Sequence, residues 1–200
     1  MKNLTRFKQF YHFYSHVMRF KQQKNNKERE FSIFGSLSLK NGSHGKKNLH
    51  KGAKIVAIGG GTGLSTMLRG LKLHTSNLTA VVTVADDGGG SGILRKDLGI
   101  IPPGDIRNCI LALAETEPVM EQLLQYRFRE GMLKGQSFGN LFLAAMNGIS
   151  SSFVEAVKRM SDVLAVTGKV LPVTTSNVQL CAELENGDII IGESKIGERN

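Results

Sequence analysis

Residues 54–65 have the sequence KIVAIGGGTGLS, an apolar run followed by four glycines within five positions. Val56, Ala57 and Ile58 favour a strand buried on both faces, as in a parallel sheet. A helical pattern follows from Thr66. The glycines permit a tight turn and a close approach of ligand to backbone, and free N–H groups at a helix N-terminus attract anions. The stretch therefore predicts a phosphate site, with a purely structural strand-to-helix turn as the alternative.

This glycine pattern differs from two common nucleotide-binding motifs. No Lys-Ser or Lys-Thr pair follows at the P-loop spacing, and no glycine stands where the third glycine of the dinucleotide fingerprint belongs. A nicotinamide-dependent oxidoreductase is therefore disfavoured.

A second loop of the same kind follows a second apolar run. Residues 78–85 predict a buried strand, and residues 86–92 read DDGGGSG. Ligands of open α/β sheets bind outside the carboxyl ends of the strands, so the two loops are expected to share one rim. Of the pair Asp86 and Asp87, one carboxylate suits a hydrated Mg²⁺ and the other suits the loop backbone. An Asp-Gly turn is the alternative for the pair, and a disordered connector is the alternative for the glycines.

Two further segments carry polar side chains that suit a ligand. Residues 101–108 read IPPGDIRN, in which Asp105 is expected to cap a helix over 106–114. Arg107 and Asn108 then lie in its first turn, where the arginine fork can hold phosphate oxygens or simply face solvent. Farther along, Gly139-Asn140 opens a predicted helix, and ordinary capping is the favoured interpretation there.

The rest of the chain completes an α/β pattern that ends in an antiparallel ribbon. Asn186-Gly187 is a strong hairpin signal. Helical patterns are expected over 94–98, 119–128, 141–146 and 153–160, the last of them capped by Ser152 or a neighbouring residue. Strand-like patterns are expected over 163–166, 169–175, 178–184 and 189–192.

Composition bounds the class of protein. The 200 residues suit one domain with a core, no apolar run approaches a membrane span, and no signal peptide is evident. Cys109 and Cys181 form neither a metal spacing nor a disulfide framework, which favours a reducing cytoplasm. Four of the five histidines lie in the first 50 residues, so zinc sites and histidine triads are disfavoured.

The basic charge is concentrated in a leader. Residues 1–53 hold 12 Lys and Arg against 2 Glu, whereas residues 54–200 hold 14 against 15 acidic residues. The domain over 54–200 therefore lacks a nucleic-acid footprint. The leader is expected to be a basic, disordered extension. A basic amphipathic helix over residues 7–18, lying on a membrane surface or a partner, is the alternative.

Four motifs together carry a family resemblance: GGGTGLS at 59–65, TVADDGGGSG at 83–92, PPGDIRN at 102–108 and SFGNL at 137–141. They resemble the family of the gluconeogenesis factor (YvcK-type) and 2-phospho-L-lactate transferase (CofD-type). The resemblance implies a Rossmann-like three-layer α/β/α fold with a mostly parallel sheet. It also implies that the basic leader is extra, and that the chain carries only the N-terminal portion of a longer fold.

Two functions follow from the resemblance. The first is a cytoplasmic regulator that binds a UDP-sugar or another nucleoside diphosphate, needed for cell shape during gluconeogenic growth. The second is a Mg²⁺-dependent 2-phospho-L-lactate transferase-like enzyme of coenzyme F420 biosynthesis. Whether the chain is an enzyme, and whether it forms a homo-oligomer, stays open. The resemblance implies that Asp86 and Asp87 lie near the metal or the transferred group, as metal ligands or catalytic groups. It also implies that the ligand is surrounded by Gly60, Gly61, Thr62, Gly63, Ser65, Gly90, Ser91, Arg95, Asp105, Arg107, Asn108 and Asn140.

Overall fold

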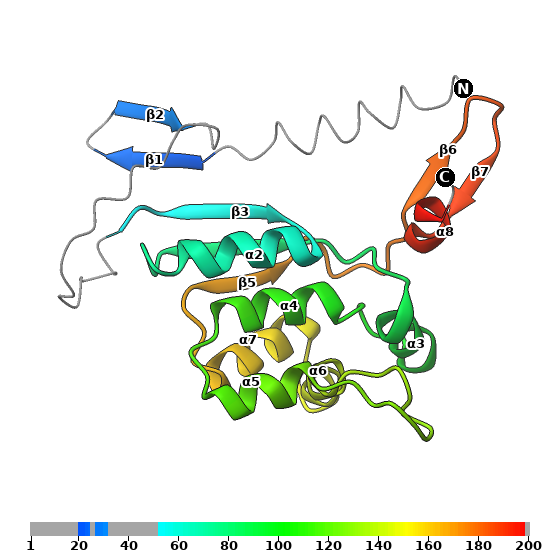
Figure 1. Ribbon diagram of the computed structural model, residues 1–200. Helices are drawn as coiled ribbons and strands as arrows, with labels where there is room; N and C mark the ends of the chain where they lie inside the picture. Colours follow the sequence, from blue (N-terminus) through cyan, green and yellow to red (C-terminus); the bar gives the residue numbers. More distant parts are fainter. Residues whose placement is uncertain (1–19, 25–26, 32–51, 199–200) are drawn as a thin grey trace.

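The computed structural model describes residues 20–24, 27–31 and 52–198 (Figure 1). Strands β1 (Phe20–Lys24) and β2 (Lys27–Phe31) pair antiparallel. The predicted amphipathic helix at residues 7–18 lies outside the described residues, as does most of the segment predicted to be disordered. Within the described residues, every helix falls short of the length and apolar character that a bilayer crossing requires.

A parallel three-stranded sheet forms the centre of the fold, in the order β3 (Ile55–Gly59), β4 (Leu78–Val82), β5 (Lys169–Pro172). Ala57 stands beside Ala80, and Ala80 beside Val170, so these three buried side chains share one face. The expected α/β class with a mostly parallel sheet is confirmed.

Helices connect the strands. Helix α2 (Gly61–Leu71) links β3 to β4, and five helices lie between β4 and β5. They are α3 (Gly89–Leu98), α4 (Gly104–Leu113), α5 (Pro118–Gln125), α6 (Phe138–Gly148) and α7 (Phe153–Val163). Figure 1 shows α2, α4 and α7 on the same side of the sheet. Helix α4 is the most deeply buried, with Ile106, Cys109, Ile110 and Leu113 fully enclosed.

The opposite face of the sheet is apolar and exposed in the described structure. Val56 is 54% exposed and Ile58 is 58% exposed, and Leu171 and Val173 on β5 and just after it are exposed too. The prediction that the first strand is buried on both faces is therefore wrong for the described residues. The described helices supply a covering layer for one side of the sheet only.

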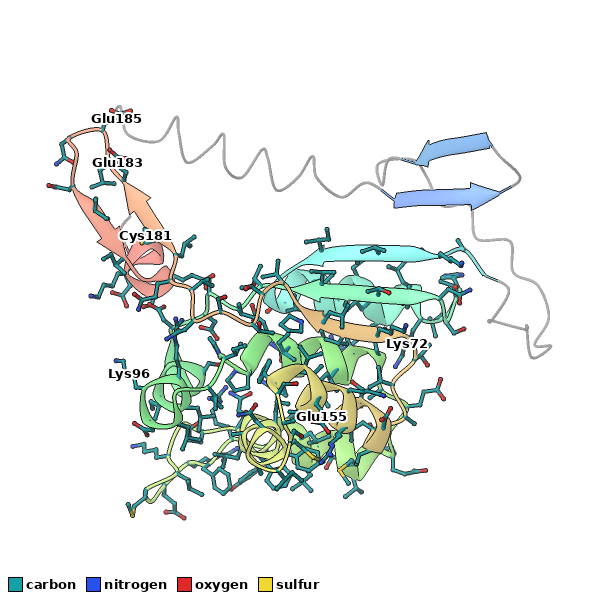
Figure 2. All side chains as sticks on the ribbon, turned by 180° about the vertical axis from the view of Figure 1, so that it is seen from behind. Lys72, Lys96, Glu155, Cys181, Glu183 and Glu185 are labelled. Carbon is teal, nitrogen blue, oxygen red and sulfur yellow. The ribbon has the colours of Figure 1, made fainter. Side chains whose placement is uncertain are left out.

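The antiparallel ribbon predicted near the C-terminus is confirmed. Strands β6 (Cys181–Glu183) and β7 (Ile189–Ile191) pair around a turn in which Gly187 has φ +86°. Helix α8 (Glu193–Gly197) follows directly. Figures 1 and 2 show this ribbon projecting from the α/β body, with Glu183 and Glu185 toward its far end in Figure 2.

Three local predictions are wrong. Residues 88–92 are not a loop, because α3 begins at Gly89 and includes most of the glycine run. Asp105 does not cap α4, which begins one residue earlier and has Pro103 at its N-cap position. Residues 163–166 form the end of α7 and the turn after it rather than a strand. By contrast, Ser152 caps α7 as the sequence suggests, accepting a hydrogen bond from the Glu155 N–H.

Candidate functional site

The two predicted turns lie at the same end of the sheet. Strand β3 ends at Gly59, and the backbone N–H of Thr83, just past β4, donates to the Gly59 carbonyl at 2.9 Å. Because the strands are parallel and neighbours, their carboxyl ends face one direction. The structure therefore brings the turn at 59–63 and the segment at 83–92 together at the carboxyl ends of β3 and β4, as predicted. We call this end of the sheet, formed by residues 59–63, 83–92 and the start of α4, the rim.

The carboxylate of Asp105 lies directly against the first turn. A Cβ built on Gly60 would stand 2.9 Å from Asp105 Oδ2, and one on Gly61 would stand 3.1 Å from Oδ1. Gly61 also has φ +52°, a conformation that glycine adopts without strain. The close approach of the Asp105 carboxylate from α4 therefore requires glycine at both positions, whether or not a ligand also binds there.

Two neighbours hydrogen-bond Asp105. The hydroxyl of Thr83 donates to Oδ2 at 3.4 Å, and the backbone N–H of Gly61 also donates to the carboxylate. Burial raises the pKa of Asp105, and the nearby charge of Asp86 raises it further, against the opposite effect of these donors and Arg107. An ionised carboxylate here is therefore costly unless a cation approaches it.

Asp86 is the second carboxylate of the rim. Its Oδ1 accepts from the Gly88 N–H at 2.9 Å, which closes an Asx turn before α3. Its Oδ2 lies 3.1 Å from the position of a Cβ on Gly104, where the Ser91 hydroxyl also converges. Asp86, Ser91 and Asp105 thus gather around the start of α4.

Asp87 points elsewhere. Its Oδ1 accepts a hydrogen bond of 2.8 Å from the Ser194 N–H in the first turn of α8, and its Oδ2 packs on Gly192. The Ser194 N–H lowers the pKa of Asp87, an effect that partial burial opposes. The adjacent Asp pair therefore divides between the rim and the ribbon.

A third acidic side chain, Glu193, reaches this region, and sequence reasoning missed it. Burial raises the pKa of Glu193, and the charges of Asp86, Asp105 and Asp87 raise it further. The sequence gives no sign of this role, because Glu193 is separated from Asp86 and Asp87 by about a hundred residues. The fold reveals it, since Glu193 lies at the point where the chain leaves β7 and rejoins the α/β body. Among the described residues, no group of three or more His, Cys, Asp or Glu side chains is arranged to hold a metal ion.

The Mg²⁺ expectation can be tested against this donor set. Mg²⁺ commonly takes one or two carboxylates, with water and substrate phosphates completing its shell. Asp86 and Asp105 fit that requirement, since both face the rim. Among the described residues, no Lys or Arg nitrogen lies within ion-pair distance of the Asp105 carboxylate, although the charge of Arg107 acts on it. Asp87 fits it less well, because Ser194 already occupies one of its oxygens.

A cationic and amide-bearing side of the rim comes from α4 and α6. Arg107 Nε donates to Asn140 Oδ1 at 3.2 Å, and Asn140 is 3% exposed. Burial lowers the pKa of Arg107, and the neighbouring charge of Arg127 lowers it further. The structure thus joins two predicted residues, Arg107 and Asn140, and adds Arg127, which the sequence did not single out.

The other predicted residues are not all available to a ligand. Thr62 and Gly63 are exposed at the start of α2, and Asn108 is half-buried. Ser65 is 4% exposed and its hydroxyl donates to the Thr62 carbonyl, so it faces inward. Gly90 is buried beneath Gln136.

Arg95 is drawn away from the rim toward the segment before β6. Its Nη2 donates to the Asn177 side-chain oxygen and, at 2.7 Å, to the Val178 carbonyl. Arg95 therefore fixes the start of the ribbon segment instead of presenting its Nη2 to a ligand.

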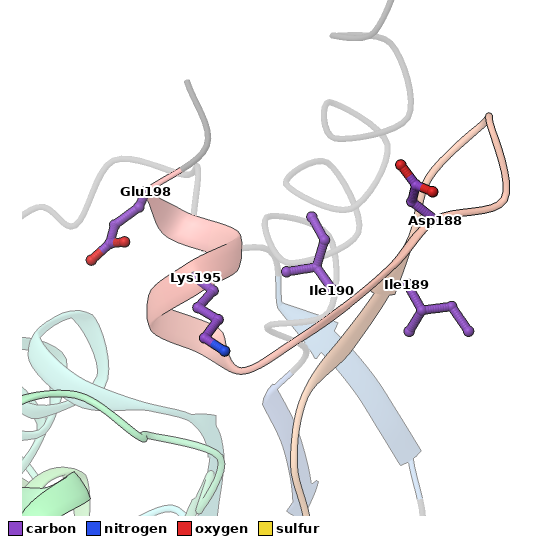
Figure 3. Close-up of a pocket in the computed structure, with 5 residues that line it drawn as sticks. All are labelled: Asp188, Ile189, Ile190, Lys195 and Glu198. Carbon is purple, nitrogen blue, oxygen red and sulfur yellow. The ribbon is translucent and has the colours of Figure 1, made fainter.

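Two hollows of the surface lie away from these residues. One, about 490 Å³ and open to solvent, is formed by the ribbon and α8 and is lined by Asp188, Ile189, Ile190, Lys195 and Glu198 (Figure 3). The other, about 60 Å³, lies between residues 99–102 and 175–178, beside Val84. Neither is lined by the carboxylates of the rim.

Comparison with known proteins places the chain in a family. The family described as 2-phospho-L-lactate transferase CofD matches residues 55–200, which is most of the chain. The chain belongs to this family.

The curated relatives of the chain are named as gluconeogenesis factors rather than as transferases. A "Putative gluconeogenesis factor" from Clostridium acetobutylicum is 73% identical over 164 residues, covering 82% of this chain and 36% of the relative. One from Thermoanaerobacterium thermosulfurigenes is 77% identical over 145 residues, covering 72% and 45%. The "Gluconeogenesis factor" of Bacillus subtilis is 56% identical, covering 72% and 46%. The chain thus spans about half or less of these relatives.

A solved structure agrees with the fold. A crystal structure of a UPF0052 family member from Bacillus halodurans shares 53% identity at a TM-score of 0.69, over 72% of this chain and 47% of that one. The alignment of 164 residues with the C. acetobutylicum relative is longer than the family match. It therefore includes part of the segment before residue 55, which the resemblance had treated as wholly extra.

Proposed function

We propose that this CofD-family chain provides the phosphate-binding rim of a gluconeogenesis factor, a cytoplasmic regulator that binds a UDP-sugar without turning it over. Its physiological role would be maintenance of cell shape during gluconeogenic growth. The names of the relatives support the first part of the proposal. The ligand class rests on the chemistry of the rim.

The observation that carries the proposal is the division of charge around the strand ends. Asp86 and Asp105 supply the acidic side, at the start of α4, and Arg107, which hydrogen-bonds Asn140 of α6, supplies the cationic side. A Mg²⁺-bound diphosphate presents both a cation and anionic oxygens, and would meet both sides. The exposed first turn of α2, at Thr62 and Gly63, adds backbone donors and the positive end of a helix dipole.

The buried thiol of Cys109, on α4, is unsuited to act as a nucleophile for the proposed site. Cys109 is buried in α4, and burial raises its pKa to about 12. A thiol with so high a pKa is protonated near pH 7 and is a poor nucleophile. Cys109 therefore serves packing, and the proposed site lacks its contribution to covalent catalysis.

A Mg²⁺-dependent transferase of the 2-phospho-L-lactate type is the second candidate. One observation favours it: the matching family is described by that activity. The same rim would then hold the diphosphate of an activated donor while Asp86 and Asp105 bind Mg²⁺, which would polarise the transferred group.

Calorimetric titration separates the two. The full 200-residue chain is titrated with UDP-N-acetylglucosamine and with GDP, each with and without Mg²⁺, while the solutions are assayed for product. Uridine-ligand binding with no product supports the regulator. Guanosine-ligand binding that requires Mg²⁺, together with transfer product in a parallel assay that supplies a guanylyl-activated phospholactyl donor and the deazaflavin acceptor, would favour the transferase.

A variant pair tests the site. Arg107→Met keeps the length of the buried stem and removes the guanidinium, so affinity should fall about tenfold or more if the arginine holds phosphate. Arg69→Met, on the exposed side of α2, is the matched control and should retain affinity. Equal affinity in both variants would remove Arg107 from the site.

A further inference from the structure

The β6–β7 ribbon is attached to the body at both of its ends by side chains from one short stretch, residues 87–95. At the start of the ribbon segment, Arg95 Nη2 holds Asn177 and Val178. At its end, Asp87 accepts from the Ser194 N–H. Asp87 and Arg95 flank the first turns of α3, which follows the second rim segment directly.

The contact at the end of the ribbon is built for close approach. Gly192 has φ +111°, and any Cβ there would run into the Asp87 carboxylate. Glycine therefore both turns the chain out of β7 and leaves room for the Asp87 carboxylate. The backbone of Ser194 then offers an N–H that lies in the first turn of α8, where no intrahelical acceptor is available.

The contact between Asp87 and Ser194 also places Glu193 near the rim. Glu193 stands between the two residues that contact Asp87, and the charges of Asp86 and Asp105 act on it. The docked ribbon thus brings a third acidic side chain within range of the charges of Asp86 and Asp105. Any ligand or cation that reduces their repulsion would favour the docked ribbon, and by linkage the docked ribbon would favour that ligand.

We propose that the ribbon, residues 177–194, is a strap anchored beside the nucleotide rim, and that Asp87 and Arg95 are positioning residues that hold its two ends. This inference takes the identity of the ligand from the proposed function. The attachment of the ribbon by Asp87 and Arg95 does not depend on that function. It assigns Asp87 a role different from the metal ligand or catalytic group suggested by the sequence.

The test combines hydrogen exchange with binding in the full chain. Ser194→Pro removes the donor to Asp87, and proline is tolerated in a first helical turn. Amide exchange across residues 177–194 should accelerate about tenfold or more. Affinity for UDP-N-acetylglucosamine with Mg²⁺ should fall severalfold. Lys195→Ala changes the next residue of the same turn without restricting the backbone of Ser194, and neither quantity should change.

Asp87 variants separate positioning from direct binding. Asp87→Asn keeps an oxygen that accepts from Ser194, so it should retain most of the docking and affinity that Asp87→Ala loses. A direct metal ligand would instead suffer about equally from both changes. Equal damage in the two variants, or unchanged exchange in Ser194→Pro, would overturn the strap. If the wild-type chain fails to bind the UDP-sugar, the proposed function fails while the exchange result still decides the attachment.

Discussion

The two glycine-rich segments at the strand ends look alike in sequence and differ in structure. After β3, the turn stays open: Thr62 and Gly63 are exposed, and its carboxylate, Asp105, comes from another helix. After β4, Gly90 and Gly92 are folded into α3 and buried, and the local carboxylates accept hydrogen bonds from the chain itself. The comparison shows that a glycine run indicates where another group comes close to the backbone. The run does not indicate whether that group belongs to a ligand or to the protein.

The largest expected difference between the segments concerns tolerance of a side chain. Gly92→Ala would place a Cβ 2.7 Å from the Asp87 carbonyl carbon, so unfolding free energy should drop by about 3 kcal/mol. Gly63→Ala meets nothing within 4 Å and replaces a helical glycine, so stability should rise by about 0.5 kcal/mol. Urea denaturation of both variants checks this. Similar losses in the two would erase the distinction between open and filled segments.

A smaller effect is expected beneath α3. Gln136 is 5% exposed, it packs on Gly90, and its Oε1 is buried without a hydrogen-bond partner among the described residues. Replacing an unsatisfied acceptor by an apolar group removes a desolvation cost, so Gln136→Leu should stabilise by about 1 kcal/mol. Thermal melts would reveal it, with the exposed Gln125→Leu as control. A loss of stability would mean that Oε1 is satisfied in solution.

The smallest effect is a pH dependence at the open turn. Because the folded-state pKa of Asp105 is raised, its ionisation opposes folding, and this cost appears as pH rises above the ordinary aspartate range. Asp105→Asn should therefore be more stable than wild type at pH 7, with the advantage fading as both are brought below about pH 4. Denaturation at several pH values without Mg²⁺ measures it. An advantage that is constant with pH would exclude the ionisation as its cause.

The sequence predicted the framework well where local patterns control it. The buried face of β3 and β4, the helix after GGGTG, the Ser152 cap and the Asn186-Gly187 turn all depend on neighbouring residues. These features need only periodicity and turn chemistry, which a single sequence contains.

The failures arise where distant segments override local preference. Gly89, Gly90 and Gly92 have poor helix propensity, yet they begin α3. This helix packs against the hairpin-like segment at 126–138 through Gln136. The diversion of Asp87 and Arg95 to the ribbon depends on contacts over 80 residues or more. Residue type indicated their polarity, but only tertiary structure reveals which partner each one takes.

The central claim is that the backbone amides of the open turn after β3, and not those of the buried glycines after β4, receive the phosphate oxygens. A titration of the ¹⁵N-labelled chain with UDP-N-acetylglucosamine and Mg²⁺ tests it through backbone amide shifts. The account predicts large, saturable shifts at Thr62 and Gly63 and at Arg107, with smaller ones at Gly90 and Ser91. Shifts confined to Gly90 and Ser91, or none at any of these amides, would contradict it.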